Sequence, residues 1–389
     1  MNNMKNFDFH NPTRLVFGQG TIENIGKYIK EYGDKKVLLL YGKGSIFKNG
    51  VYDTVIKSLK DNNIDYVEMS GVKPNPVLSK VIETVDLMKK EKVDAIVAVG
   101  GGSVLDTSKI SAAAYYYDGN PWDFYEKKVT PKRALPIYGV LTLSATGSEM
   151  NSGGVITNEE EKKKWGWGSK FTYPRLSIVD PSVQASLPRN QTVNGAVDTI
   201  THVLEEYFDG TKGTLMQDEF SEGIIRTTMV SVRKLVEDPG DYEARANLAW
   251  AATLALNGLN GLGRDGDWAS HGIEHSISAY YDIAHAEGLA MVMPAWMKHV
   301  YKNDVDKFAR FGDKIFDIKE EDKEKAAVMA IEAYKNFLKE IGAPVSLTER
   351  NIGDEKLEVM ASNAMMRGSI GGLMKLSEED VLEILKLAL

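Results

Sequence analysis

The sequence predicts an α/β protein in two parts, the first built on a parallel sheet and the second made of helices alone. Up to residue 187, short apolar runs with strand character alternate with amphipathic segments of helical period. Such alternation is typical of a parallel sheet covered by helices. Beyond residue 187, apolar residues recur at helical period without strand-like alternation. We therefore expect a Rossmann-like domain over residues 1–187 and an all-helical domain over residues 188–389, with the boundary near Leu187-Pro188.

The expected strands of the first part are short apolar runs, several of which end at glycine. The first is KVLLLYG, and the third is DAIVAVGGG, which runs into three consecutive glycines. Runs of this length, bounded by turn residues, indicate buried strands. We expect strands at residues 36–42, 65–71, 94–102, 135–144 and 176–181.

Helical segments fill the intervals between these strands. Residues 76–92 have an apolar face and a basic C-terminal end, which suits the negative end of a helix dipole. Residues 103–117 also have helical character, and residues 46–61 read as a helix that Gly50 interrupts. The segment EEEKKKWGWGSK, residues 159–170, is expected to form a charged hairpin or lid.

The second part reads as a series of helices. Each segment has apolar residues at helical spacing, and no internal repeat or low-complexity tract interrupts the series. We expect helices at residues 193–208, 218–237, 242–259, 271–281, 304–340 and 373–388.

Composition narrows the class of protein. With 43% hydrophobic and 26% charged residues, the chain has the make-up of a soluble globular enzyme. Its net charge of -8 argues against nonspecific nucleic-acid binding, which needs a basic excess to neutralise phosphates. The N-terminus lacks the apolar core of a signal peptide, and no apolar run approaches the ~20 residues of a membrane span. We expect a cytoplasmic protein without a nucleic-acid or membrane partner.

Two glycine-rich loops follow expected strands. Gly100–Ser103 lies between a strand and a helix, where backbone N–H groups and the helix dipole favour a phosphate. Asp106 and Lys109 follow in the first two turns of that helix. The loop Gly42–Ser45 follows the first expected strand, but it matches only part of a dinucleotide-binding pattern because Phe47 stands at the third glycine position. Either loop alone could be a simple turn, and together they favour nucleotide binding.

The second part holds a set of side chains that could bind a metal ion. Asp198 and His202 are four residues apart in a helical segment, and so are His271 and His275, while His285 follows shortly after. Residues at this spacing share one helical face. Imidazoles and a carboxylate suit a divalent transition metal, and the absence of cysteine excludes a thiolate site. A metal held in this way with an open position acts as a Lewis acid.

Other interpretations of these residues remain open on spacing alone. Asp198 and His202 could form a buried polar pair, and His271 and His275 could be satisfied core histidines. If Asp198 and three histidines fill the metal's protein ligands, one of the four histidines remains for proton transfer, and spacing does not say which. His10 and His299 are isolated and are expected to be structural or surface residues.

Longer motifs make the chain resemble the iron-containing alcohol dehydrogenase family over essentially its whole length. The motifs are FDFHNPTRLVFGQGTIENIG, GGGSVLDTSK, LTLSATGSEMNSGGVI, DPSVQASLP, NGAVDTITHVLEEY and DWASHGIEHSISAYYDIAHAEGLAMVMP. Within the family, the segments YGKGSIFKNGVYD and DWASH resemble the branch of NAD(P)H-dependent butanol dehydrogenases and broad aldehyde reductases. The resemblance implies a dehydroquinate synthase-like fold, in which a dinucleotide-binding domain precedes a helical metal-binding domain.

The resemblance also assigns roles to individual residues. The family's metal ligands correspond to Asp198, His202, His271 and His285, and His275 corresponds to a histidine that lines the site without binding metal. The family's cofactor contacts correspond to Gly42, Gly44, Ser45, Gly101, Gly102, Ser103, Asp106, Thr142, Leu143, Ser144, Lys164 and Leu187. A homodimer is also implied, because the family's counterpart of LVFGQG commonly pairs across a subunit interface.

These inferences lead to an expected function, a metal-dependent oxidoreductase that transfers hydride between NAD(P)H and an aldehyde or primary alcohol. We expect one Fe²⁺ or Zn²⁺ to polarise the carbonyl oxygen and His275 to take part in the proton relay. The loop Gly42–Ser45 carries Lys43 and no acid, which favours NADP(H) over NAD(H). Glu68 is the competing candidate, since a ribose-binding acid would favour NAD(H). The alternative functions are a non-redox lyase like dehydroquinate synthase, a metallohydrolase and an inactive binding protein.

Overall fold

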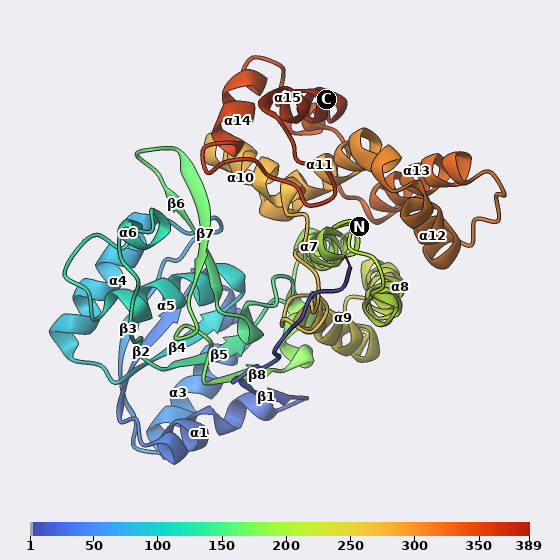
Figure 1. The fold of residues 1–389 in the computed structure, drawn as a ribbon. Helices are drawn as coiled ribbons and strands as arrows, with labels where there is room; N and C mark the ends of the chain where they lie inside the picture. Colours follow the sequence, from blue (N-terminus) through green and yellow to red (C-terminus); the bar gives the residue numbers. More distant parts are fainter. Residues whose placement is uncertain (1–2) are drawn as a thin grey trace. The chain divides into compact units, whose positions relative to one another are not determined.

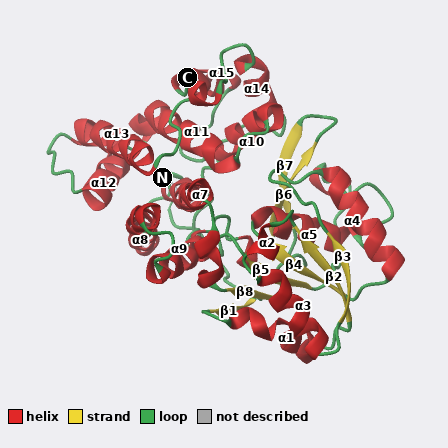
Figure 2. Ribbon diagram, turned by 180° about the vertical axis from the view of Figure 1, so that it is seen from behind, coloured by secondary structure: helices red, strands yellow, loops and turns green. Residues whose placement is uncertain are grey.

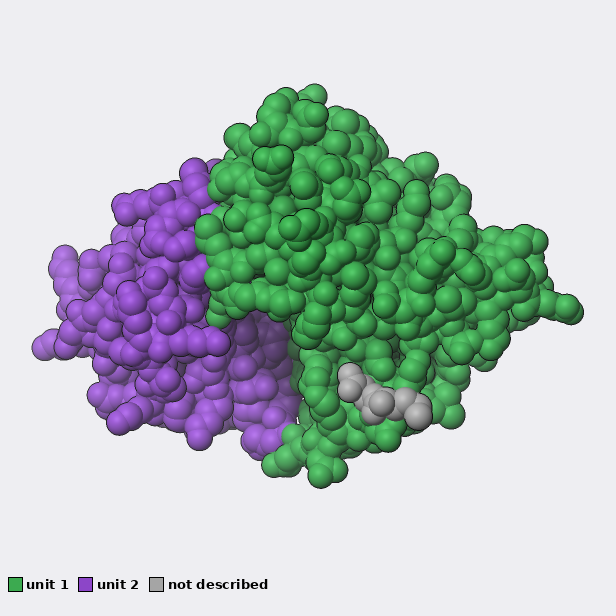
Figure 3. Space-filling model, turned by 45° about the horizontal axis from the view of Figure 1, so that its top comes forward, with its two compact units in different colours: residues 1–9, 189–237, 254–389 green, residues 10–188, 238–253 purple. Residues whose placement is uncertain are grey.

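The computed structural model describes residues 3–389, which form two compact units (Figures 1 and 3). Unit 2 comprises residues 10–188 and 238–253. Unit 1 comprises the N-terminal segment that ends at Phe9 together with residues 189–237 and 254–389. Every strand found in residues 3–389 belongs to unit 2, and unit 1 is helical (Figure 2). The predicted α/β fold class is confirmed.

The core of unit 2 is a parallel sheet of six strands, ordered β1-β8-β5-β4-β2-β3. All five neighbouring pairs run parallel. The residues of β4, β5 and β8 are all buried, which explains why these strands read in the sequence as unbroken apolar runs. The strands are β1 (Arg14–Phe17), β2 (Lys36–Tyr41), β3 (Asp65–Met69), β4 (Ala95–Gly100), β5 (Ile137–Leu141) and β8 (Leu176–Val179).

Helices cover both faces of this sheet (Figure 1). Alternate strand residues point to opposite faces, so Leu39 and Val97 pack on one side while Leu38 and Ile96 pack on the other. The first face is covered by η1 (Thr21–Asn24), α1 (Ile25–Tyr32), α2 (Ser45–Lys48) and α3 (Val51–Asp61). The second is covered by α4 (Leu78–Glu91), α5 (Gly102–Ala114) and α6 (Trp122–Tyr125).

The predicted hairpin near residues 159–170 is present. It consists of β6 (Gly153–Asn158) and β7 (Lys163–Gly168), which pair antiparallel and project from the sheet (Figure 1, green). Stacked aromatic rings fasten it to α6, with ring centroids 5.2 Å apart for Trp122 and Trp165 and 5.1 Å apart for Phe124 and Trp167. Offset aromatic pairs of this kind add to the stability that apolar burial gives.

Unit 1 contains most of the helices beyond residue 188. They are α7 (Arg189–Tyr207), α8 (Leu215–Glu237), α10 (Ala269–Tyr281), α11 (His285–Val300), α12 (Val305–Phe316), α13 (Lys323–Ile341), α14 (Leu357–Ala364) and α15 (Glu378–Leu387). The helix expected at 304–340 is divided into α12 and α13. The one expected at 373–388 begins at Glu378, because a capping box of Ser377 and Asp380 fixes its start. None of the helices described over residues 3–389 combines the length and apolarity that crossing a membrane requires.

Two features of unit 2 depend on contacts between distant segments. Strand β1 was not predicted; it is only four residues long and pairs with β8, more than 150 residues later. Helix α9 (Tyr242–Ala255) lies mostly in unit 2. Its Ala249 packs with the core on the second face of the sheet, and the ring of Trp250 meets that of Phe17 edge-on, with centroids 6.1 Å apart. The assignment of separate functions to two domains that meet near Leu187-Pro188 stays a prediction.

Candidate active site

The predicted cofactor loops lie side by side at the carboxyl edge of the sheet. Strands β2, β4 and β5 are neighbours, and their last residues are in register: Tyr41 pairs with Val99 and Gly100 with Leu141. The loops that follow, Gly42–Ser45, Gly101–Ser103 and Thr142–Ser144, therefore begin at the same level. Helices α2 and α3, which follow β2, cover one face of the sheet, whereas α5, which follows β4, covers the other. Ligands of open parallel sheets bind at such a topological switch point.

The loop before α5 leaves its backbone accessible because side chains are excluded from it. A Cβ on Gly102 would lie 2.5 Å from Cγ2 and 2.7 Å from Oγ1 of Thr146. A Cβ on Gly100 would lie 2.4 Å from Cγ2 of Val104. Both positions are too close for any residue but glycine. The N-terminal N–H groups of α5 are thereby offered without side-chain cover, as phosphate binding at a helix N-terminus needs.

Asp106 and Lys109, one turn apart on α5, fasten neighbouring segments to that helix. Asp106 accepts hydrogen bonds from the Ser148 hydroxyl (2.8 Å) and the Val155 backbone N–H (2.9 Å). Nζ of Lys109 donates to Ser148 Oγ, Asn151 Oδ1 and the Gly153 carbonyl at 2.7–2.8 Å. Burial lowers the pKa of Lys109 to about 8. One oxygen of the Asp106 carboxylate thus holds Ser148 after β5 and the other holds Val155 of β6, whereas the family resemblance implies a cofactor contact at Asp106.

The remaining predicted cofactor residues are spread over several elements of unit 2. Lys164 is buried in β7, and its Nζ donates to Asn75 Oδ1 at 2.9 Å. Ser144 is buried and accepts from Gln184 Nε2 at 2.8 Å. Leu187 is half-buried at the end of η3 (Pro181–Ser186). Their part in cofactor binding stays a prediction.

Glu68, the competing ribose-binding candidate, is exposed near the end of β3 and has two tyrosine partners. Its carboxylate accepts hydrogen bonds from the hydroxyls of Tyr41 (2.8 Å) and Tyr52 (2.9 Å). Burial, and after it these contacts with Glu68, raises the pKa of both tyrosines to about 12. The predicted loop residues Lys43, Gly44 and Ser45 are exposed. A carboxylate already engaged by two hydroxyls is a weaker candidate for binding the ribose.

The predicted metal ligands converge in unit 1. Asp198 and His202 share a face of α7, with Nδ1 of His202 3.7 Å from Oδ1 of Asp198. Nε2 of His285, the first residue of α11, is 3.8 Å from the same oxygen. His271 on α10 completes the group: one ligand atom each from Asp198, His202 and His271 lies within 4.8 Å of the others. A metal with ligand bonds of about 2.0–2.2 Å holds its ligand atoms about 3–3.6 Å apart, close to these separations.

The protonation of His202 and the lack of hydrogen bonds at two buried atoms also suit a metal ion. Burial lowers the pKa of His202 to about 3, so its imidazole is neutral, which is the form that binds metal. Oδ1 of Asp198 and Nδ1 of His202 are buried without a hydrogen-bond partner within the described chain. Buried polar atoms without partners are costly, and coordination to a cation would satisfy both.

The fourth histidine, His275, lies beside this group. Its ring centroid is 5.5 Å from that of His285 and 6.4 Å from that of His271. His275 and His285 are half-buried, whereas His202 and His271 are buried, so solvent reaches the cluster on the side of His275 and His285. The four histidines therefore lie close together. Which three bind the metal and which one transfers a proton stays a prediction.

Two buried glutamates next to the cluster were not predicted. Glu205 lies seven residues after Asp198 on α7, and its Oε1 is 2.9 Å from Nδ1 of His271. Glu274 on α10 contacts Nδ1 of His285. Charged residues on amphipathic helices usually face solvent, so both escaped notice. The available signal was their position, since a residue at i+7 from Asp198 or i+3 from His271 shares the face that carries the ligands.

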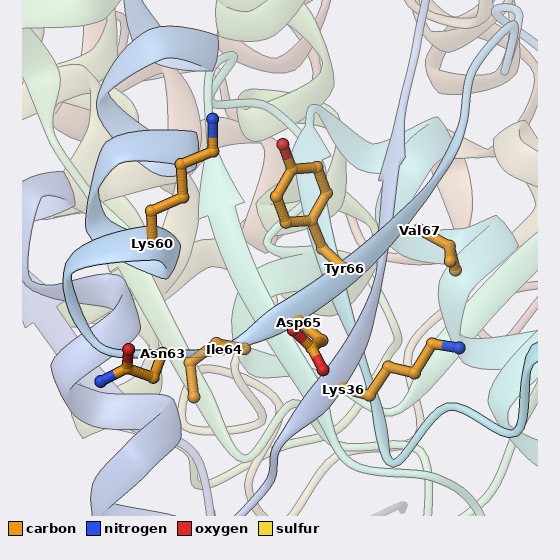
Figure 4. A pocket seen from close by; sticks show the side chains of 7 residues that line it. All are labelled: Lys36, Lys60, Asn63, Ile64, Asp65, Tyr66 and Val67. Atoms are coloured by element: carbon orange, nitrogen blue, oxygen red, sulfur yellow. The ribbon is translucent and has the colours of Figure 1, made fainter.

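A separate hollow lies on the surface of unit 2, and none of its lining residues belongs to the predicted cofactor loops (Figure 4). Its lining comes from Lys36, the end of α3 and residues 63–67, around the amino ends of β2 and β3. In a parallel sheet this is the edge opposite the carboxyl ends where ligands bind. Nζ of Lys36 is held by Glu91 at 2.9 Å. Nothing in its chemistry connects this hollow with the predicted site.

Comparisons with known proteins match both parts of the chain to one family. Residues 12–181 match the family model described as iron-containing alcohol dehydrogenase, and residues 192–389 match the C-terminal model of the Fe-containing alcohol dehydrogenase family. The probable NADH-dependent butanol dehydrogenase 1 of Bacillus subtilis (strain 168) is 45% identical over 99% of this chain and 100% of its own. The NADPH-dependent aldehyde reductase of Escherichia coli (strain K12) is 37% identical over 92% of each chain.

A solved structure extends the likeness to the fold. The crystal structure of NADH-dependent butanol dehydrogenase A from Thermotoga maritima has 55% sequence identity and a TM-score of 0.97, and the match covers 100% of both chains. The chain therefore belongs to the iron-containing alcohol dehydrogenase family, in the branch of butanol dehydrogenases and aldehyde reductases that its motifs resembled.

Proposed function

We propose that this protein is a metal-dependent, NAD(P)H-dependent oxidoreductase that reduces aldehydes such as butanal to primary alcohols. The observation that carries the proposal is the buried group of Asp198, His202 and His271, with Nε2 of the half-buried His285 3.8 Å from the Asp198 carboxylate, in a chain that belongs to this family. Relatives named butanol dehydrogenase or aldehyde reductase support the same substrate class.

In this proposal the four residues hold one divalent metal, Fe²⁺ or Zn²⁺. The metal supplies Lewis-acid polarisation of the carbonyl oxygen, and the nicotinamide supplies the hydride. A ligand set of neutral imidazoles and one carboxylate suits both metals, so the donor set does not choose between them. The half-buried position of His285 supports the idea that substrate would reach the cluster from its side.

His275 is proposed as the proton-transfer residue. It is half-buried, lies within 5.5 Å of the His285 ring and belongs to a helix that also supplies a ligand. An imidazole changes its protonation near neutral pH, which suits a group that returns a proton to the product oxygen through water or the cofactor ribose.

The test is the absorbance of NADPH at 340 nm with butanal, measured on metal-free protein and after addition of Fe²⁺ without oxygen or of Zn²⁺. We expect oxidation of NADPH only when both aldehyde and metal are present. A protein that hydrolyses esters or eliminates phosphate under these conditions, and oxidises no NADPH, would favour the hydrolase or lyase alternative instead.

For the cofactor we propose a preference for NADP(H) over NAD(H). The loop Gly42–Ser45 has no acid that would repel a 2′-phosphate, and Lys43 adds a positive charge. Glu68 is engaged by two tyrosine hydroxyls. The relatives divide on this point: the Bacillus and Thermotoga proteins are named NADH-dependent, and the Escherichia protein is named NADPH-dependent.

Gly44 is the position at which to test this preference. A Cβ there would meet no atom within 4 Å, and its φ of -127° suits any residue, so a side chain can be added without strain. We expect kcat/KM to favour NADPH in the wild type and NADH in Gly44→Asp, because the carboxylate repels the phosphate. Gly44→Asn is the matched control and should keep the NADPH preference. A wild type that favours NADH tenfold, about 1.4 kcal/mol, would contradict the proposal.

We also propose a homodimer that forms through β1. This strand stands at one end of the sheet order, so one edge has no strand partner in the described chain. The N–H groups of Arg14 and Gly18 donate toward β8, and those of the alternate residues Leu15 and Phe17 point to the open edge. Phe17 and Trp250 are exposed beside this edge. An unpaired strand edge with apolar neighbours is suited to pairing with a second copy.

Sedimentation at micromolar concentration tests the dimer. We expect twice the chain mass of 43.1 kDa for the wild type and the single-chain mass for Leu15→Pro, which removes one outward N–H. Leu15→Ala keeps that N–H and should remain dimeric. Two further statements stay predictions: the cytoplasmic location, and the assignment of cofactor binding to residues 1–187 and metal binding to residues 188–389.

A further inference from the structure

Two buried carboxylates stand directly behind two of the proposed metal ligands. Glu205 and Glu274 are both fully buried. Oε1 of Glu205 lies 2.9 Å from Nδ1 of His271, and Oε2 of Glu274 contacts Nδ1 of His285. The same relation therefore occurs twice, from two different helices, α7 and α10.

These contacts determine which ring nitrogen remains for another ligand. When Nδ1 of an imidazole donates its hydrogen to a carboxylate, Nε2 keeps its lone pair. Nε2 of His285 is directed at the cluster, where it lies 3.8 Å from Oδ1 of Asp198. A carboxylate behind a metal-binding imidazole also holds the ring plane and makes the imidazole a better donor.

We propose that Glu205 and Glu274 are positioning residues for the metal site, which orient His271 and His285 and fix the tautomer that leaves Nε2 for the metal. This inference rests on the proposed function, because it takes the two histidines to be ligands.

Each carboxylate is itself held in place. Oε1 of Glu205 also accepts the backbone N–H of His271 at 2.9 Å, within the first turn of α10. Glu274 accepts a hydrogen bond from the Ser278 hydroxyl one turn further along the same helix. Room for its side chain comes from Gly288 on α11, where a Cβ would lie 2.6 Å from Cγ of Glu274. Helix capping alone would explain Glu205, but it does not explain Glu274.

The experiment measures how fast the metal leaves and how it is coordinated. Wild type and variants are loaded with Co²⁺, their visible absorption spectra are recorded, and release into an excess of chelator is timed. Glu205→Ala and Glu274→Ala should release the metal about 10–100-fold faster than wild type and show altered Co²⁺ bands. Glu205→Gln and Glu274→Gln, which keep an oxygen to accept the Nδ1 hydrogen, should recover much of the wild-type behaviour.

Two further variants separate this role from a general loss of stability. Gly288→Ala leaves every charged group in place but displaces Glu274, so it should speed metal release as Glu274→Ala does. Glu222→Ala is the control: this buried glutamate of α8 accepts from Tyr207 and Arg310, away from the cluster. It should lower the unfolding temperature and leave the Co²⁺ spectrum and the release rate unchanged.

The outcomes distinguish this inference from the proposed function. If the wild type binds no divalent metal, the metal site itself is wrong. If the wild type binds Co²⁺ and the folded alanine variants keep its spectrum and release rate, the positioning role alone is overturned. Should Glu205→Ala and Glu274→Ala fail to fold, Gly288→Ala decides by the same measure: a wild-type spectrum and release rate would overturn the role of Glu274.

Discussion

The two predicted binding regions, one in each unit, offer different parts of the chain to a ligand. In unit 2, the loops after β2 and β4 offer backbone N–H groups, and glycines keep side chains away. In unit 1, α7, α10 and α11 offer buried side chains that meet at Asp198. Cofactor binding should therefore be lost when a side chain is added to a loop glycine, whereas metal binding should be lost when a ligand side chain is removed.

This difference predicts that a substitution can abolish metal binding without affecting cofactor binding, and the reverse. Both regions belong to separate compact units, and the residues that carry each lie within one unit. Variants that lose metal should still bind NADPH, and variants that lose NADPH should still bind metal. The predictions below test that independence.

The largest effect is expected for Asp198→Ala. This residue contacts both His202 and His285, so its removal should abolish metal binding and lower kcat/KM for butanal roughly a thousandfold, the rate equivalent of several kcal/mol of Lewis-acid stabilisation. Metal analysis, circular dichroism and NADPH titration of one preparation measure this. Full metal occupancy with wild-type turnover would contradict the assignment.

His275→Ala should have the next largest effect and should spare the metal. We expect metal content to remain at the wild-type level, kcat to fall about a hundredfold, and its pH dependence to change, because a proton-transfer group is lost. His285→Ala provides the comparison and should lose the metal. If the two variants behaved in the opposite way, the division of the histidines would be wrong.

Gly102→Ala should affect the cofactor alone. The added methyl would meet Thr146 at 2.5 Å, and overpacking of this kind costs about 1–3 kcal/mol, enough to raise the KM for NADPH roughly ten- to hundredfold. Gly223→Ala on α8, outside the predicted cofactor loops, is the matched control, since nothing lies within 4 Å of a Cβ there. Unchanged NADPH binding in Gly102→Ala with normal metal content would show that this loop does not contact the cofactor.

The smallest effect concerns Lys109, a buried residue of α5 whose ammonium group holds Ser148, Asn151 and Gly153. Its folded-state pKa of about 8 is below its ordinary value of 10.5, so between these values the unfolded chain binds the proton more tightly. Stability due to this group therefore increases as pH rises from 8 to 10.5. The unfolding temperature of wild type relative to Lys109→Met should increase from pH 7 to pH 9.5. A difference that stays constant with pH would contradict this.

Much of the fold could be predicted because its signals are local. The glycines after β2 and β4, the alternation of apolar runs and amphipathic segments, and the break at Gly50 each reflect neighbours in the chain. The four residues of β1 gave no such signal, because they become a strand only by pairing with β8. The helical character of α9 could be predicted from its sequence, but its place in unit 2 could not, because it depends on distant partners such as Phe17.

In the candidate site, too, some features have local sequence signals and others depend on contacts between distant segments. The spacing of Asp198 and His202 predicted a shared helical face, and the structure brings both to the cluster. Spacing could not separate His275 from the ligands, since the separation depends on where α11 starts relative to α10. Glu205 and Glu274 were missed because a charge on a helix is read as exposed unless the packing against it is known.

The central claim is that one divalent metal, held by the cluster in unit 1, makes this chain an NADPH-dependent aldehyde reductase. The most direct test is a titration of metal-free wild type with Fe²⁺ in the absence of oxygen, and separately with Zn²⁺, while butanal-dependent oxidation of NADPH is followed. The account predicts that activity rises in proportion to added metal, for at least one of the two ions, and stops rising at one ion per chain. Full activity of the metal-free protein, or no activity with either metal, would contradict it.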